Sequence, residues 1–83
     1  MRGNILIVDD ELGPRESLRM ILKAEHDVRT ASSGEEALAE VERQKPDLVF
    51  LDLRMPGMSG TKVLEAIKAK HPDVEVAIIT AYA

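Results

Sequence analysis

The chain has 83 residues, which allows one small domain. Its 11 Lys and Arg against 15 Asp and Glu give a net charge of −4, which argues against direct nucleic-acid contact by this segment. Hydrophobic residues make up 45% and charged residues 31%, as in globular proteins, and the lack of cysteine excludes disulfides, thiolate metal sites and a cysteine nucleophile. The longest apolar runs hold four residues, so we expect neither a membrane span nor a secretion signal but a cytoplasmic domain.

The chain begins with a predicted strand and a predicted helix. Residues 4–8 (Asn-Ile-Leu-Ile-Val) form an apolar run rich in β-branched residues, which is typical of a strand buried on both faces. Leu18, Ile21 and Leu22 then recur at helical spacing and predict one apolar stripe. Pro14 fits the first turn of this helix, where proline is tolerated.

A second strand, a second helix and a third strand follow. Residues 28–31 (Val-Arg-Thr-Ala) alternate in polarity, which indicates an edge strand with one wetter face. Ser33, followed three residues later by Glu36, matches a capping box at the start of a helix. The apolar stripe of that helix consists of Ala37, Leu38 and Val41. Residues 48–51 (Leu-Val-Phe-Leu) form another continuous apolar run and predict an interior strand.

The last two predicted elements complete an alternating order. Val63, Leu64 and Ile67 indicate a third helix, for which Ser59 is the expected N-cap. Residues 74–79 (Val-Glu-Val-Ala-Ile-Ile) predict a fourth strand. Strands that alternate with helices in this way predict an α/β fold, with a parallel sheet covered by helices.

Little of the chain follows the last predicted strand. Residues 76–79 are apolar on both faces, as in an interior strand, yet only residues 81–83 come after Thr80. Either the chain is a piece of a longer domain, or another chain supplies the missing neighbour. We expect a domain truncated at its carboxyl end, which self-associates through the exposed edge of its sheet.

Acidic residues gather at the predicted strand ends. Asp9 and Asp10 follow the first strand, Asp52 follows the third, and Thr80 follows the last. Binding groups of a parallel α/β sheet collect at this edge, and carboxylates that share a pocket repel one another unless a cation such as Mg²⁺ is present. The alternative is that each residue only shapes the turn after its strand. That interpretation weakens when all four lie at the same end of the sheet.

A recognisable set of motifs is carried by residues 7–11 (Ile-Val-Asp-Asp-Glu), by Arg15 and Leu18, by residues 51–60 (Leu-Asp-Leu-Arg-Met-Pro-Gly-Met-Ser-Gly), and by residues 79–81 (Ile-Thr-Ala). In this order and spacing the motifs resemble the receiver domain of two-component response regulators over the whole chain. The opening Asp-Asp-Glu-x-x-x-Arg-x-x-Leu and the closing Thr-Ala-Tyr are also similar to receivers of sigma-54-dependent transcriptional activators.

The resemblance implies a flavodoxin-like sheet with strand order 2-1-3-4-5. Residues 1–83 then form an incomplete receiver domain with the pattern (βα)3β and strand order 2-1-3-4, because the fifth strand and the last helices are missing. The implied function is phosphorelay signal transduction, in which a sensor histidine kinase is the partner and Mg²⁺ is the cofactor. The output domain, such as a transcription activator, is expected to be absent from this chain. The domain is expected to catalyse only its own phosphoryl transfer and hydrolysis and is not otherwise an enzyme.

The resemblance also assigns roles to individual residues. Asp52 is the expected phospho-acceptor, and Asp10 and Asp52 are expected to bind Mg²⁺ directly. Asp9 is expected to hold the ion through water, and the main-chain carbonyl of Arg54 completes the protein ligands. Thr80 is expected to contact a phosphoryl oxygen and so to report phosphorylation to the rest of the fold.

Two rival hypotheses accompany this interpretation. The lysine and the switch aromatic of the family's fifth strand are absent along with that strand, which favours an inert receiver fragment or interaction module that binds metal without productive phosphorylation. A phosphohydrolase of the haloacid dehalogenase type needs a second carboxylate two positions after its aspartyl nucleophile. Arg54 occupies that position after Asp52, which excludes this class.

Overall fold

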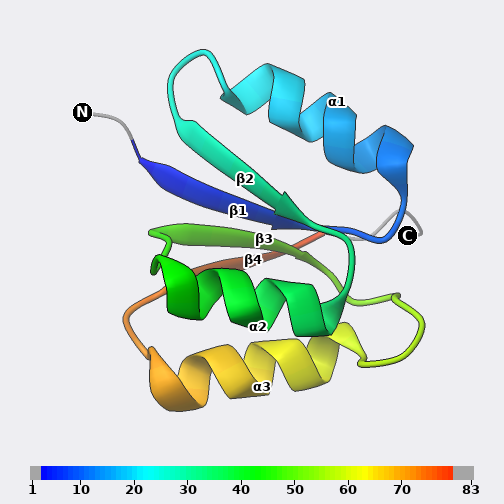
Figure 1. Cartoon of the computed structure of the whole chain (residues 1–83), viewed down its shortest axis with the longest axis vertical. Helices are drawn as coiled ribbons and strands as arrows, with labels where there is room; N and C mark the ends of the chain where they lie inside the picture. The colour runs from blue at the N-terminus through cyan, green and yellow to red at the C-terminus, as the bar shows by residue number, and fades with distance from the viewer. Residues whose placement is uncertain (1–2, 80–83) are drawn as a thin grey trace.

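The computed structural model describes residues 3–79, in which four strands alternate with three helices (Figure 1). The elements are β1 (Asn4–Val8), α1 (Leu12–Leu22), β2 (Asp27–Ala31), α2 (Gly34–Arg43), β3 (Leu48–Asp52), α3 (Gly60–Lys70) and β4 (Glu75–Ile79). The predicted order of alternating strands and helices is confirmed. The strand bounds differ from the predicted ones by one residue at most: β2 also includes Asp27, β3 also includes Asp52, and Val74 precedes β4, with its N–H donating to the His71 carbonyl in a turn (3.1 Å). No helix in the described part of the chain is long and apolar enough to cross a membrane.

The four strands form one parallel sheet in the order β2-β1-β3-β4, as predicted. Ile5 of β1 pairs with Val28 on one side and with Leu48 on the other, and Leu48 pairs in turn with Glu75 of β4. Since all strands run in the same direction, their carboxyl ends meet at one edge of the sheet. This edge carries Asp9, Asp10 and Asp52.

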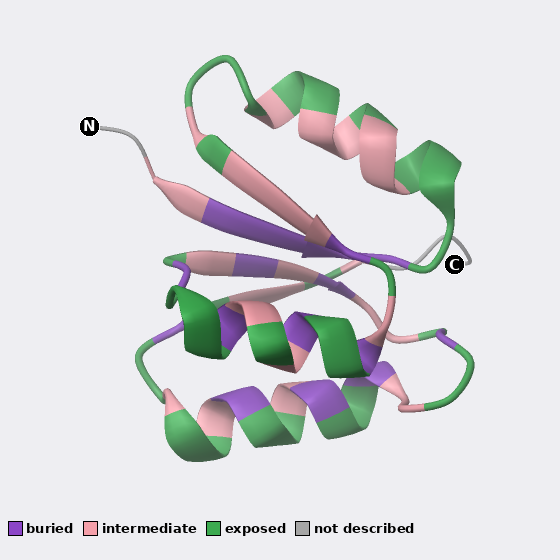
Figure 2. Cartoon of the chain, viewed as in Figure 1, coloured by how far each residue is buried: buried purple, intermediate pink, exposed green. Residues whose placement is uncertain are grey.

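Helices cover the two faces of the sheet unequally. In Figure 1, α2 and α3 lie on one face and α1 lies on the other. The main core lies between the sheet and the α2–α3 pair, and Figure 2 shows buried stretches in β1, β3, α2 and α3. Its members from β1, β3, α2 and α3 are Leu6, Val8, Val49, Leu51, Ala37, Val41, Val63 and Ile67. Because β1 and β3 are anchored in this core, their carboxyl ends have fixed positions.

The predicted apolar stripe of α1 is partly wrong. Leu18 and Leu22 are half-buried, but the Ile21 side chain is 72% exposed. Residues three and four apart share one side of a helix, so spacing alone places Ile21 beside Leu18, and its exposure puts it at the uncovered edge of the stripe. A single described helix covers this face of the sheet, and no second helix there packs against Ile21.

Two serine caps place α2 and α3. The Ser33 hydroxyl accepts a hydrogen bond from the Glu36 N–H (3.1 Å), which confirms the N-cap half of the predicted capping box. The Glu36 carboxylate, however, accepts a hydrogen bond from the Ser32 hydroxyl (3.1 Å). Ser59 caps α3 in the predicted way, with its hydroxyl accepting from the Lys62 N–H (3.3 Å).

Candidate functional site

Asp9 stands one residue beyond β1 and is held at three atoms. Its main-chain N–H donates to the Ala31 carbonyl of β2 (3.1 Å), and its carboxylate oxygen Oδ1 accepts from the Glu11 N–H (2.9 Å). Its carbonyl accepts a hydrogen bond from the Arg15 guanidinium (2.9 Å). With 5% of its surface exposed, Asp9 is a buried charged group at the end of a buried strand.

Asp52 is the last residue of β3 and is held in a similar way. Its Oδ1 accepts a hydrogen bond from the Arg54 N–H (2.9 Å), which orients the carboxylate across the turn that follows the strand. The first residue of α3, Gly60, donates its N–H to the Leu53 carbonyl (3.3 Å) and so brings the helix against this turn. Asp52 is half-buried, so solvent reaches the carboxylate from one side.

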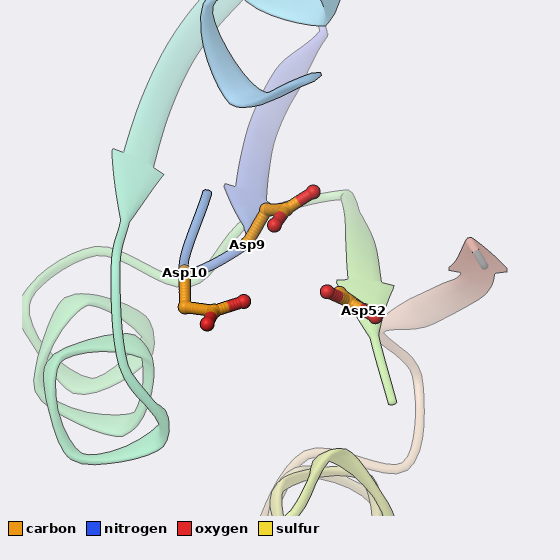
Figure 3. Close-up of side chains that lie close together, drawn as sticks. All are labelled: Asp9, Asp10 and Asp52. Carbon is orange, nitrogen blue, oxygen red and sulfur yellow. The ribbon is translucent and has the colours of Figure 1, made fainter. Parts of the chain in front are cut away.

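These strand ends bring three carboxylates together. Asp9, Asp10 and Asp52 each offer an oxygen, and these oxygens all lie within 4.8 Å of one another. Figure 3 shows Asp52 pointing from the end of β3 towards the Asp9–Asp10 segment that follows β1. The three residues range from buried Asp9 through half-buried Asp52 to exposed Asp10, so the cluster is rooted in the fold and open on one side.

Burial raises the pKa of the Asp9 carboxyl above its ordinary value. The hydrogen bond from the Glu11 N–H opposes this shift, and the negative charges of Asp52 and Asp10 add to it. A raised pKa means that the ionised form of Asp9 is destabilised where it stands. A bound cation would remove this destabilisation, because it attracts the same negative charges that now repel one another.

The donor set fits a hard divalent cation. Three carboxylates within reach of one point, one of them exposed, provide the oxygen ligands that Mg²⁺ prefers and leave room for water. The turn hydrogen bonds of Asp9 and Asp52 do not compete with this use, since an ionised carboxylate has two oxygens and about four acceptor sites. Asp9 and Asp52 can therefore shape the turns after their strands and bind a cation at the same time.

The structure thus gathers the three predicted aspartates, whereas other assignments stay predictions. Arg54 follows the cluster directly and contributes its N–H to Asp52, while the metal role of its carbonyl is untested. Thr80 lies outside the described residues. Sequence reasoning missed the contact of Arg15 with the Asp9 main chain. The available signal was its place in the first turn of the helix that follows the two aspartates.

Comparisons with known proteins identify the class to which this sheet and acidic edge belong. The family model of the response regulator receiver domain matches residues 5–83. The chain therefore belongs to this family, and it is a signalling domain of the phosphorelay class, as the resemblance implied.

Individual relatives agree with the family. Sporulation initiation phosphotransferase F of Bacillus subtilis is 40% identical over 83 residues, which cover 99% of this chain and 67% of that protein. Transcriptional regulatory protein ZraR of Escherichia coli is 41% identical, over 95% of this chain and 18% of that protein. The crystal structure of response regulator TrrA from Thermotoga maritima in complex with Mg²⁺ and BeF superposes with a TM-score of 0.92 at 43% identity, covering 100% of this chain and 72% of that one. The chain thus spans less than a fifth of one relative and about two thirds of others.

Proposed function

We propose that the chain accepts a phosphoryl group on Asp52 from a phosphohistidine of a sensor histidine kinase. The observation that carries the proposal is the cluster itself, in which the Asp52 carboxylate meets two further carboxylates at the open edge of the sheet. An acceptor of this kind needs little covalent chemistry from the protein. It needs a positioned oxygen and compensation of the negative charge on the transferred group.

The proposed step is a nucleophilic displacement at phosphorus. An ionised oxygen of Asp52 forms a bond to phosphorus, the nitrogen–phosphorus bond of the phosphohistidine breaks, and its electron pair stays on the imidazole of the kinase. The Arg54 N–H holds Oδ1 of Asp52, so the carboxylate is oriented before the donor arrives. Asp10 and Asp52 would hold Mg²⁺ directly, Asp9 through water, and the Arg54 carbonyl would add a ligand. The ion supplies neutralisation of charge on the phosphoryl oxygens.

Several wider features belong to the same proposal. Thr80 contacts the phosphoryl group and biases the equilibrium between two packings of the domain. The domain works in the cytoplasm as a switch for an output such as transcription activation, and it catalyses no reaction apart from its own phosphorylation and dephosphorylation. β4 pairs only with β3 in the described sheet, and its Ile78 is 43% exposed, which supports self-association through this edge.

Intact mass spectrometry after incubation with acetyl phosphate tests the proposal. We expect one added phosphoryl mass that requires Mg²⁺ and that disappears in Asp52→Asn. Asp73→Asn is the matched control, because this exposed carboxylate pairs with Lys45 outside the cluster and its loss should leave labelling unchanged. A chain that binds Mg²⁺ but gains no mass would instead be the inert receiver of the second hypothesis.

A further inference from the structure

Arg15 connects the first turn of α1 to the acidic edge of the sheet. Its guanidinium nitrogen Nη1 donates a hydrogen bond to the main-chain carbonyl of Asp9 at 2.9 Å. The side chain belongs to a half-buried residue. Arg15 therefore contacts the backbone of the cluster and not its carboxylates.

The bonded carbonyl belongs to the peptide that joins Asp9 to Asp10. This peptide is planar and rigid, so a bond that fixes its oxygen also fixes the direction in which the chain leaves towards Asp10. β1 ends at Val8, which places the Asp9–Asp10 peptide beyond the strand. The Asp9 N–H is held by Ala31, and Arg15 supplies the restraint on the other side of the residue.

We propose that Arg15 is a positioning residue for cation binding, which holds the Asp9–Asp10 peptide so that both carboxylates face Asp52. The inference rests on the proposed function, because the site it serves is the proposed cation site. In this proposal Arg15 acts by orienting the Asp9–Asp10 peptide through its hydrogen bond, and not through its positive charge. Outer contacts that orient ligands commonly change metal affinity by about 10- to 100-fold when they are removed.

Charge and geometry predict opposite results for this residue. A guanidinium near a cation site repels the cation, so loss of its charge alone would tighten Mg²⁺ binding. Loss of the hydrogen bond frees the Asp9–Asp10 peptide and weakens binding. Arg15→Gln removes the charge and the fork of donors, while Arg15→Lys keeps the charge but replaces the planar fork by a point donor on a shorter side chain.

Arg19 is a matched control on the same helix. It lies about one turn further along α1, and its guanidinium pairs with Glu16 (2.8 Å) instead of with the Asp9 backbone. Arg19→Gln therefore removes the same charge from the same element without touching the acidic edge. Any effect that Arg15→Gln shares with Arg19→Gln is an effect of net charge.

The experiment is isothermal titration of Mg²⁺ into the wild-type chain and the three variants, each shown to be folded by circular dichroism. We expect the dissociation constant to rise about tenfold in both Arg15→Gln and Arg15→Lys. It should change by less than about twofold in Arg19→Gln, because the Arg19 charge is paired with Glu16 and screened by salt. The Asp10 amide resonance should shift in the two Arg15 variants without Mg²⁺. Equal or tighter binding by Arg15→Gln, with normal binding by the wild type, overturns the inference alone. No Mg²⁺ binding by the wild type overturns the proposed cation site and the inference together.

Discussion

Gly60 offers a direct test of how the fold supports the site. It begins α3, and a Cβ at this position would lie 2.5 Å from Leu53 Cα and 2.6 Å from the Asp52 carbonyl oxygen. Both atoms belong to the backbone at the end of β3, so neither can move aside without moving the strand end. Gly60→Ala should therefore displace either α3 or the turn that carries Asp52.

The magnitude follows from two opposing effects. Alanine is favoured over glycine within a helix by about 0.8–1 kcal/mol, and less at a helix end. Forcing extra atoms into a packed site typically costs about 1–3 kcal/mol, and the upper part applies where the clashing atoms are backbone. We expect Gly60→Ala to lower the free energy of unfolding by about 1–2 kcal/mol. In a domain of this size, each kcal/mol lowers the melting temperature by about 4–8 °C.

Gly13 provides the control by the same substitution. It lies in the first turn of α1, and apart from its chain neighbours and the backbone of its own helix nothing lies within 4 Å of the position that its Cβ would take. Pro14 follows Gly13 and disfavours the helical conformation for a preceding residue that carries a Cβ, which offsets the gain in helix propensity, so Gly13→Ala should change the free energy of unfolding by less than about 1 kcal/mol. Urea denaturation of both variants measures the two effects. If Gly60→Ala is as stable as the wild type, the close approach of α3 to β3 is wrong.

Three further predictions concern the fold and the site. The Arg29 side chain is 15% exposed and donates hydrogen bonds to the Asn4 side chain, to the Gln44 carbonyl, and to the carbonyl and carboxylate of Glu40. Arg29→Ala should therefore lower the free energy of unfolding, measured by urea denaturation, by about 2–3 kcal/mol. Arg43→Ala, which removes a 61% exposed partner of the same Glu40, should cost less than about 1 kcal/mol, and equal losses in the two variants would contradict the larger contribution of the Arg29 hydrogen bonds. The raised pKa of Asp9 means that the folded state binds this proton more tightly than the unfolded state, so without Mg²⁺ the wild type should lose stability relative to Asp9→Asn as the pH rises from about 4 towards neutrality. A pH-independent difference between the two chains would refute that shift. Mg²⁺ at a hundredfold excess over its dissociation constant should stabilise the wild type by about 2.7 kcal/mol, and an unchanged melting temperature would contradict the cation site.

Two of the strands could be predicted from the sequence because they are apolar on both faces. Residues 4–8 and 48–51 have no polar face to expose, which left an interior parallel strand as the natural interpretation, and both strands were found. Ile21 could not be placed in the same way. Helical spacing assigns it to the stripe of Leu18, but whether a helix position is covered depends on what packs against it from elsewhere in the chain.

The carboxylates of the candidate site could be predicted from the sequence, but the main-chain contacts around them could not. Asp9, Asp10 and Asp52 could be grouped because parallel strands end at one edge, so their position in the sequence relative to each strand was sufficient. The contacts of Arg15 and Gly60 are made to main-chain atoms of Asp9 and of residues 52 and 53. Contacts of this kind depend on the angle at which a helix leaves the sheet, and no residue pattern encodes that angle by itself.

The burial of the strands explains why the acidic edge is suited to a cation. Val8 and Leu51 are 0% exposed, so the residues that lead into Asp9 and Asp52 cannot retreat to relieve repulsion between the carboxylates. Rotation of the carboxylates is limited as well, because each gives one oxygen to the N–H two residues later. Repulsion that neither backbone nor side chain can relieve favours the binding of a proton or of a positive ion. At neutral pH protons are scarce, and the exposed side of Asp10 leaves the ion a path to the cluster.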